Sequence, residues 1–158
     1  MIDREFLDQV LCRRATADQV VVGLDPGRKR TGCVVMATEP VVGVILAKRL
    51  TNPGVCDLLW EVEPDLICVE GFRLYPWIAK DKRWDHFPEI RVIGAICEVA
   101  RVCGIPVVEI SAAQNKKATP NEHLYILGTW TTCHHTTDAF RVFWTVIFGK
   151  LDEEALRR

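Results

Sequence analysis

The chain has 158 residues, of which 49% are hydrophobic and 26% are charged, and its net charge is −1. This balance is that of an ordinary globular domain, and it excludes a disordered chain and a fibrous repeat. No apolar run reaches the roughly 18–20 residues that span a membrane, and residues 1–14 lack the apolar block of a signal peptide. We therefore expect one domain over residues 1–158, located in the cytoplasm and without a membrane partner.

The cysteine pattern indicates a reducing compartment. Seven cysteines are present, and none of them forms a CxxC pair. An odd count without that spacing argues against a disulfide framework and against structural zinc. Cys33, Cys68 and Cys97 lie within apolar runs, where we expect them to pack as small hydrophobic side chains.

The first half of the chain predicts a helix followed by three antiparallel strands. Apolar residues near helical spacing predict a short helix within residues 2–14. Apolar, partly β-branched runs predict strands over residues 20–24, 32–37 and 41–50. The turn signals between these strands are short, which favours a meander. Asn52-Pro53 then predicts the start of a helix that continues to about residue 62.

The second half predicts two strands that are each reached through a helix. Residues 66–69 form a wholly apolar strand of the buried parallel type, and residues 107–110 form the next strand. Helices are predicted over residues 89–103 and 135–148, and a short helix with loops over residues 111–133. The order of elements predicts an α/β fold, with a mixed five-stranded sheet covered by helices on its faces.

Three carboxylates occupy positions where a role in core packing is hard to assign. Asp25 ends the first strand, Glu70 ends the fourth, and Asp138 lies near the start of the last helix. If the first and fourth strands are parallel neighbours, Asp25 and Glu70 meet at one edge of the sheet. Clustered carboxylates repel one another and normally hold hard cations such as Mg²⁺, which activate water in phosphodiester cleavage.

Each of these residues also has a simpler interpretation. Asp25 begins an ordinary Asp-Pro-Gly turn, Glu70 could be a loop carboxylate, and Asp138 could serve only the helix dipole. His134 and His135 are surface imidazoles or a metal pair, without the HxxxH or CxxC companion that zinc requires. His135 lies three residues before Asp138, so these two side chains share a helix face.

Basic residues gather in three short segments, which together hold nine basic residues against the single acid Asp81. Positive segments on an otherwise acidic chain suit phosphate binding, although solvated loop charge is the alternative. The basic residues are Arg28, Lys29, Arg30, Arg73, Lys80, Lys82, Arg83, Lys116 and Lys117.

Four motifs in chain order resemble the RuvC-type Holliday junction resolvases of the RNase H-like superfamily, especially their short phage forms. VVVGLDPGRKRTGCVVM resembles the first motif, and PDLICVEGF resembles the second. GAICEVARVCGIPVVEISAAQNKK resembles the helix, strand and lysine segment that follow, and HHTTDAFRVF resembles the final-helix motif. The match runs from about residue 20 to residue 148 and implies an RNase H-like fold. Residues 1–18 form an extension ahead of it.

The resemblance implies a catalytic role for named residues. Asp25, Glu70 and Asp138 match the metal ligands, and His135 falls where the family has a fourth acid or a histidine. His134 remains the alternative if the register of that motif is off by one. Mg²⁺ is the implied cofactor, with Mn²⁺ as a possible substitute.

The resemblance also implies how the chain binds DNA. Lys116 matches a basic residue near the scissile phosphate, with Lys117 as the fallback, and Phe72 matches an aromatic residue that stacks on a base. Tyr75 and Trp77 are further stacking candidates, and packing within their own loop is the simpler alternative.

The implied activity is a metal-dependent endonuclease that nicks branched DNA, above all four-way junctions, as a homodimer paired through residues 89–103. Two alternatives stay open: an RNase H-like nuclease that processes structured RNA, of the pre-ribosomal-RNA type, and a non-catalytic junction-binding protein. The stretch between Lys117 and His135 is shorter than in the bacterial enzymes, and the loop after Glu70 has its own aromatic and basic pattern. The preferred DNA sequence therefore stays open.

Overall fold

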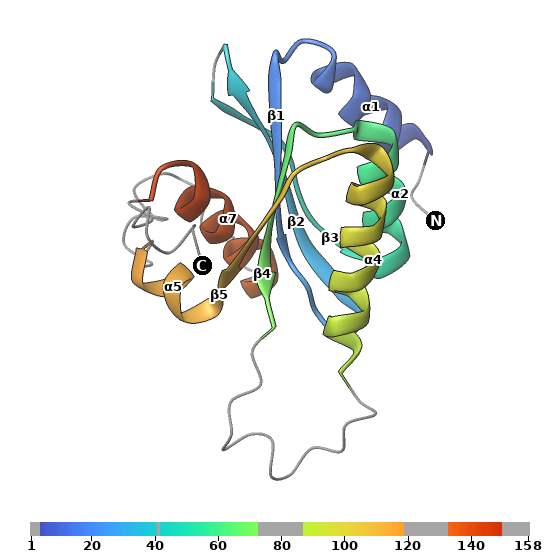
Figure 1. Ribbon diagram of the computed structural model, residues 1–158. Coiled ribbons are helices and arrows are strands. Elements are labelled where there is room, and N and C mark those ends of the chain that lie inside the picture. The colour runs from blue at the N-terminus through green and yellow to red at the C-terminus, as the bar shows by residue number, and fades with distance from the viewer. Residues whose placement is uncertain (1–3, 41, 73–86, 119–132, 150–158) are drawn as a thin grey trace, which may run out of the picture.

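A computed structural model describes residues 4–40, 42–72, 87–118 and 133–149, and a five-stranded sheet lies at its centre (Figure 1). The strands are β1 (Gln19–Asp25), β2 (Arg30–Glu39), β3 (Gly43–Thr51), β4 (Leu66–Gly71) and β5 (Val107–Ser111). Their order is β3-β2-β1-β4-β5, with β1, β2 and β3 antiparallel and with β4 and β5 parallel to β1. The predicted mixed sheet is confirmed.

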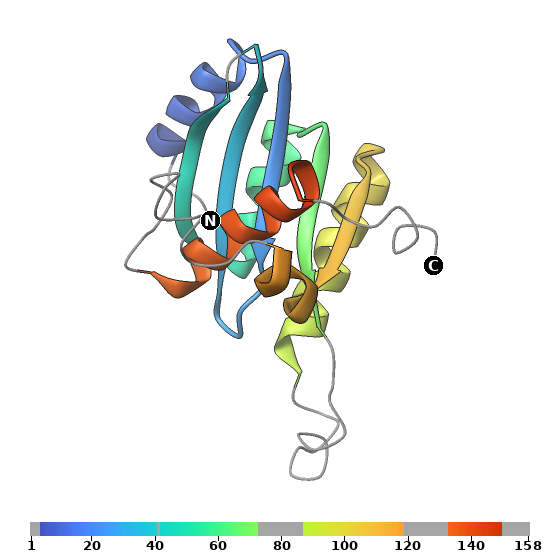
Figure 2. The same ribbon diagram turned by 90° about the vertical axis from the view of Figure 1, so that its left-hand side faces the viewer.

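Helices cover both faces of this sheet. Helices α1 (Arg4–Arg14), α2 (Asn52–Val62) and α4 (Pro88–Cys103) lie on one face, and α5 (Ala112–Ala118) and α7 (His134–Ile147) lie on the other (Figures 1 and 2). Each predicted helix is present. The segment predicted as a short helix with loops begins with α5, and residues 119–132 lie outside the described part. Within the described ranges, no helix has the length and apolar character needed to cross a membrane.

Alternation along β1 divides the core into two layers. Val20, Val22 and Leu24 pack beneath α2 and α4, whereas Val21 packs beneath α7. Successive side chains of a strand point to opposite faces, so Asp25 lies on the α7 face with Val21. Asp25, the last residue of β1, therefore lies on the face that α5 and α7 cover.

The hairpin that follows Asp25 is fixed by the start of α2. The amide of Asn52 donates to the carbonyl of Gly27 at 3.2 Å and accepts from the hydroxyl of Thr31 at 2.9 Å. The hydroxyl of Thr51 accepts from the N–H of Gly54 at 3.2 Å and caps the helix. The turn next to Asp25 is therefore tied to the body of the domain.

The cysteine prediction is correct at two positions and wrong at one. Cys33 and Cys68 are buried in the sheet, as expected, but Cys97 is exposed. It follows Ile96, which is fully buried, so the 100° turn per residue in α4 directs Cys97 outward. An apolar run in an amphipathic helix does not bury all its members.

Candidate active site

Four neighbouring strands align four residues in one row across the α7 face of the sheet. Asp25 of β1 pairs with Gly32 of β2, and Gly32 pairs with Arg49 of β3. On the other side, the parallel register of β1 and β4 runs to Leu24 and Val69, so the next two residues, Asp25 and Glu70, are neighbours. The sheet thus brings together two predicted ligands that are 45 residues apart in sequence.

Helix α7 approaches the row at Gly32. A Cβ built at Gly32 would overlap the carbonyl oxygen of His135, and one built at Gly23 would overlap that of Ala139. Only a residue without a side chain allows a helix backbone to come so close to the sheet. The two glycines therefore determine where the first turns of α7 lie, and with them His135 and Asp138.

His135 and Asp25 are in direct polar contact. The Nδ1 atom of His135 lies 2.5 Å from Oδ2 of Asp25, and the imidazole also borders Gly27. Asp25 is only 8% exposed. Burial raises the pKa of its carboxyl above the ordinary value, and the charge of Asp138 adds to the rise, while the bond and charge of His135 offset only part of it.

Glu70 is held by a chain of two hydrogen bonds that involves residues of α5 and α7. The buried amide of Asn115 donates to Oε2 of Glu70 at 2.9 Å, and it accepts from the hydroxyl of Thr145 at 3.1 Å. Burial raises the pKa of the Glu70 carboxyl, and the negative charges of Asp25 and Asp138 raise it further, against the opposing bond from Asn115. The site is thus a set of carboxylates that repel one another.

The start of α5 positions Asn115, which our sequence analysis missed. The N–H of Ser111 donates to the side chain of Gln114 at 3.1 Å, and the N–H of Gln114 donates to the hydroxyl of Ser111 at 3.3 Å. This is the reciprocal capping box that the sequence Ser-x-x-Gln encodes. The pattern was readable in the sequence and would have predicted a helix beginning at residue 112.

Asp138 has a partner that the sequence did not reveal. The guanidinium of Arg141 donates to its Oδ1 atom from one turn further along α7. Arg141 is 5% exposed, so its charge is buried with this carboxylate beside it. The spacing of three residues between an acid and an arginine in a helix predicts their ion pair. It does not predict that the arginine is buried.

Lys116 lies where the resemblance predicts a basic residue. Its positive charge acts on the carboxyls of both Asp25 and Glu70 and lowers their pKa, although less than burial raises it. Lys117 is also exposed in the last turn of α5. The charge of Lys116 is thus felt at both carboxylates, and its contact with a phosphate stays a prediction.

The other predicted DNA-binding residues divide into two groups. Arg28, Lys29 and Arg30 are exposed on the hairpin that follows Asp25. Phe72 is half-buried and packs against Phe87, with 5.1 Å between ring centroids, so packing already occupies part of its surface. Arg73, Tyr75, Trp77, Lys80, Lys82 and Arg83 lie outside the described residues.

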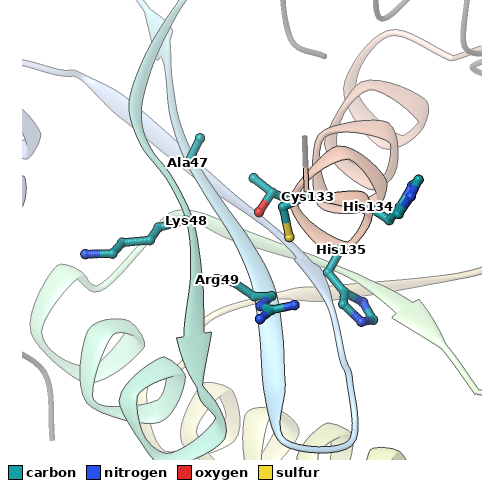
Figure 3. Close-up of a pocket in the computed structure, with 7 residues that line it drawn as sticks. Ala47, Lys48, Arg49, Cys133, His134 and His135 are labelled. Atoms are coloured by element: carbon teal, nitrogen blue, oxygen red, sulfur yellow. The ribbon is translucent and has the colours of Figure 1, made fainter. Parts of the chain in front are cut away.

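The two histidines at the start of α7 point in different directions (Figure 3). His135 reaches Asp25, whereas His134 is exposed and has no such contact among the residues described. Both border a pocket of about 690 Å³ between β3 and the start of α7, together with Ala47, Lys48, Arg49, Cys133 and Thr136. Of the two, only His135 faces the carboxylates.

The carboxylates suit a hard cation by their chemistry, but they do not form a closed ligand set. Asp25, Glu70 and Asp138 each give one oxygen to a protein partner, and the second oxygen of each has none among the described residues. Over the same ranges, no group of three or more His, Cys, Asp or Glu side chains is arranged to hold a metal ion. Oxygen donors whose mutual repulsion a cation would relieve fit Mg²⁺ or Mn²⁺.

Comparison with known proteins identifies the fold. No family model and no curated protein matches the sequence. Among solved structures, Thermus thermophilus RuvC aligns with a TM-score of 0.60 at 21% identity, covering 78% of this chain and 90% of that one. The same protein in complex with a Holliday junction aligns at 0.61 and 19%, covering 82% and 96%. A fowlpox virus Holliday junction resolvase aligns at 0.54 and 13%, covering 81% and 96%.

These alignments span most of both chains. The order and direction of the five strands and the helices on both faces agree with the RNase H-like expectation. The chain has the fold of the RuvC-type Holliday junction resolvases.

Proposed function

We propose that this protein is a metal-dependent endonuclease that resolves four-way DNA junctions by symmetric phosphodiester hydrolysis. The observation that carries the proposal is the convergence of Asp25, Glu70 and Asp138 with His135 and Lys116 at one end of a resolvase-like sheet. A non-catalytic binding protein gains nothing from buried carboxylates that repel each other and the phosphates of DNA. The solved relatives named above include two resolvases and one complex with a junction, which supports DNA as the substrate.

In this proposal the three carboxylates hold the cation and Lys116 meets the phosphate. A divalent cation bound to Asp25, Glu70 and Asp138 would supply positive charge to the phosphate and to the attacking water. Asn115 keeps the Glu70 carboxylate oriented, and Arg141 does the same for Asp138. The Lys116 ammonium stabilises negative charge on the phosphate in the transition state.

His135 has a proposed role that its contact with Asp25 supports. Its Nδ1 atom bonds the carboxylate, so the ring is oriented, and Nε2 has no hydrogen-bond partner among the described residues. A histidine in that position supplies a nitrogen ligand or a proton for the leaving oxygen. Either role requires the contact to be kept.

Symmetric cutting requires two active sites, and we propose a homodimer that pairs through α4. The outer face of this helix exposes Ile90 and Val102, which are 49% and 53% exposed, beside the small residues Gly94 and Ala95. The same face carries the exposed ion pair of Glu98 and Arg101, and the small residues allow close helix pairing about a two-fold axis. A single nuclease domain in the cytoplasm is part of the same proposal.

The test compares three substrates: a synthetic four-way junction, a linear duplex of the same arms and an RNA hairpin, each with Mg²⁺ and with EDTA. We expect paired nicks in the junction with Mg²⁺, and no cleavage with EDTA. Preferential cleavage of the RNA hairpin would instead favour the RNA-processing alternative. Tight junction binding without cleavage in Mg²⁺ would favour the non-catalytic alternative.

A further inference from the structure

The buried backbone of Gly27 lies between the imidazole of His135 and the side-chain amide of Asn52. His135 points toward the hairpin that joins β1 and β2 (Figure 3). A Cβ built at Gly27 would lie 3.2 Å from Cε1 and 3.4 Å from Nε2 of His135. The ring is therefore bonded to Asp25 at Nδ1 and bordered by the backbone of Gly27 beside its other two atoms.

Asn52 fixes the hairpin at Gly27 through three hydrogen bonds. Its Nδ2 atom donates to the carbonyl of Gly27 at 3.2 Å and to that of Arg28 at 3.4 Å. Its Oδ1 atom accepts from the hydroxyl of Thr31, which is fully buried, at 2.9 Å. Carbonyl oxygens only accept, so one orientation of the amide serves both ends of the turn. The buried carbonyl of Gly27 needs a donor, and Asn52 supplies it.

The side chain of Asn52 is not what starts α2. Thr51 caps this helix by accepting from the N–H of Gly54 at 3.2 Å, and a proline stands in the first turn, where its backbone geometry suits a helix. The amide of Asn52 instead bonds a turn 25 positions earlier in the chain. The helix uses position 52 as backbone, which leaves the amide to hold the turn.

The imidazole depends on this turn because much of its surface faces solvent. The side chain of His135 is 44% exposed, and its Nδ1 atom bonds Oδ2 of Asp25 at 2.5 Å. A ring that is held at one atom can swing about that bond, whereas a second support beside Nε2 limits the motion. A displacement of about 1 Å at a reacting group can cost about 10²-fold in rate. The place of Gly27 therefore bears on the place of Nε2.

We propose that Asn52 is a positioning residue for His135, because it holds the backbone of Gly27 where that backbone keeps the imidazole in contact with Asp25. This inference rests on the proposed function, since it concerns the rate of the same reaction, and it deepens that function. Asn52 acts only through the turn. Its removal should therefore slow cleavage only to the extent that His135 contributes to cleavage.

The chain offers a matched control in Thr51. It is the neighbour of Asn52 at the start of α2, and its hydroxyl bonds the helix and not the turn. Thr51→Ala removes the helix cap and should lower the Tm, but it leaves the three bonds of Asn52 in place. Thr31→Val is a second test variant, because it removes at nearly constant volume the hydroxyl from which Asn52 accepts.

The first measurement is a double-mutant cycle on single-turnover junction cleavage by the full chain with Mg²⁺. The enzyme is in saturating excess, so a change in affinity through the basic hairpin does not enter. We expect Asn52→Ala to slow cleavage roughly tenfold in the wild-type background and less than about twofold in the His135→Ala background. Thr51→Ala should cleave at the wild-type rate in spite of its lower Tm. Equal factors for Asn52→Ala in both backgrounds would overturn the proposal.

The second measurement observes the imidazole itself, in EDTA and without DNA. The chain has four histidines, and the ¹H–¹⁵N NMR signals of His135 are those that His135→Ala lacks. At one pH and temperature, we expect a downfield Nδ1 proton in the wild type and in Thr51→Ala, and its loss or broadening in Asn52→Ala. Thr31→Val should show a smaller change in the same direction, and it carries both measurements if Asn52→Ala does not fold. Unchanged His135 signals in both variants would contradict the positioning role.

A failure of this inference is distinguishable from a failure of the proposed function. A wild-type chain that cleaves no junction with Mg²⁺ would contradict the nuclease, while the His135 signals would still decide whether Asn52 positions the ring. A wild type that cleaves junctions, beside Asn52→Ala with the wild-type rate and unchanged His135 signals, would contradict only the positioning role.

Discussion

The second residue of α7 is bonded to the last residue of β1: Nδ1 of His135 lies 2.5 Å from Oδ2 of Asp25, across 110 positions of sequence. Gly32 makes this contact possible, because the backbone of His135 rests where a side chain at position 32 would be. The packing of α7 on β2 therefore determines which of the two histidines faces the carboxylates. Its neighbour His134 is exposed.

The two histidines predict different losses of activity. His135→Ala should reduce the rate of junction cleavage by roughly 10²–10⁴-fold, the range for a group that acts on the reacting atoms, whereas His134→Ala should change it little. His135→Asp should stay active with Mg²⁺, and its rate with Mn²⁺ relative to Mg²⁺ should fall, since oxygen replaces nitrogen. The measurement is the single-turnover cleavage rate in each metal. A larger loss in His134→Ala would contradict the orientation described above.

Gly32→Ala tests how α7 is seated. The new methyl group would overlap the His135 carbonyl, so α7 must shift, and we expect a loss of more than about 2 kcal/mol in the free energy of unfolding. Gly43→Ala is the control, because it also lies in a strand and nothing lies within 4 Å of a Cβ built there. Urea unfolding of both variants checks this. Equal effects on the two would mean that α7 does not rest on Gly32.

Asp138 and Arg141 should behave as a structural pair as well as a catalytic element. Arg141→Met leaves a carboxylate without its buried partner, and we expect a loss of about 3–5 kcal/mol of unfolding free energy together with slow cleavage. Asp138→Asn should abolish cleavage and also destabilise the fold, because the buried guanidinium then faces a neutral amide. Thermal unfolding of both variants is the measurement, and an unchanged Tm in either would contradict the pairing.

The raised pKa values of Asp25 and Glu70 predict the pH dependence of stability in the absence of metal. Between the ordinary carboxyl value, about 4, and the raised values, the folded state binds more protons than the unfolded state. Stability is therefore lost as pH rises through that window. Asp25→Asn removes one of these charges, so its Tm at pH 7 in EDTA should exceed that of the wild type, by about 2–4 °C for each kcal/mol relieved.

The control for this prediction is added cation. Mg²⁺ should raise the Tm of the wild type at pH 7, because it binds the folded state and relieves the same repulsion, and it should raise that of Asp25→Asn much less. A Tm of Asp25→Asn in EDTA that lies below the wild-type value across pH 5–8 would mean that the bond to His135 outweighs the repulsion.

The strands of the sheet were predictable because each is marked by a short sequence pattern within or next to it. The apolar runs of β1 and β4, the turn at Asp25 and the Asn-Pro start of α2 each predicted their element, and the structure confirms them. The carboxyl ends of parallel neighbours meet at one edge, so Asp25 and Glu70 were also predictable as a pair once the strand order was assumed.

The partners of the carboxylates were not predictable in the same way. Asn115 and Arg141 matter through tertiary contacts that depend on how α5 and α7 cross the sheet, and no spacing in the sequence encodes that crossing. The exposure of Cys97 was not predicted for a related reason. An apolar run along the sequence does not show which of its residues face outward once it forms a helix.

The most direct test is the single-turnover rate at which Asp25→Asn and Glu70→Gln cleave a four-way junction with Mg²⁺, measured beside their affinity for the same junction in EDTA. Each substitution removes one carboxylate charge at constant volume. We predict cleavage reduced by at least about 10³-fold in both variants, with junction affinity equal to or higher than that of the wild type. Wild-type cleavage rates in either variant, at full junction binding, would contradict a metal-dependent nuclease site at the end of β1 and β4.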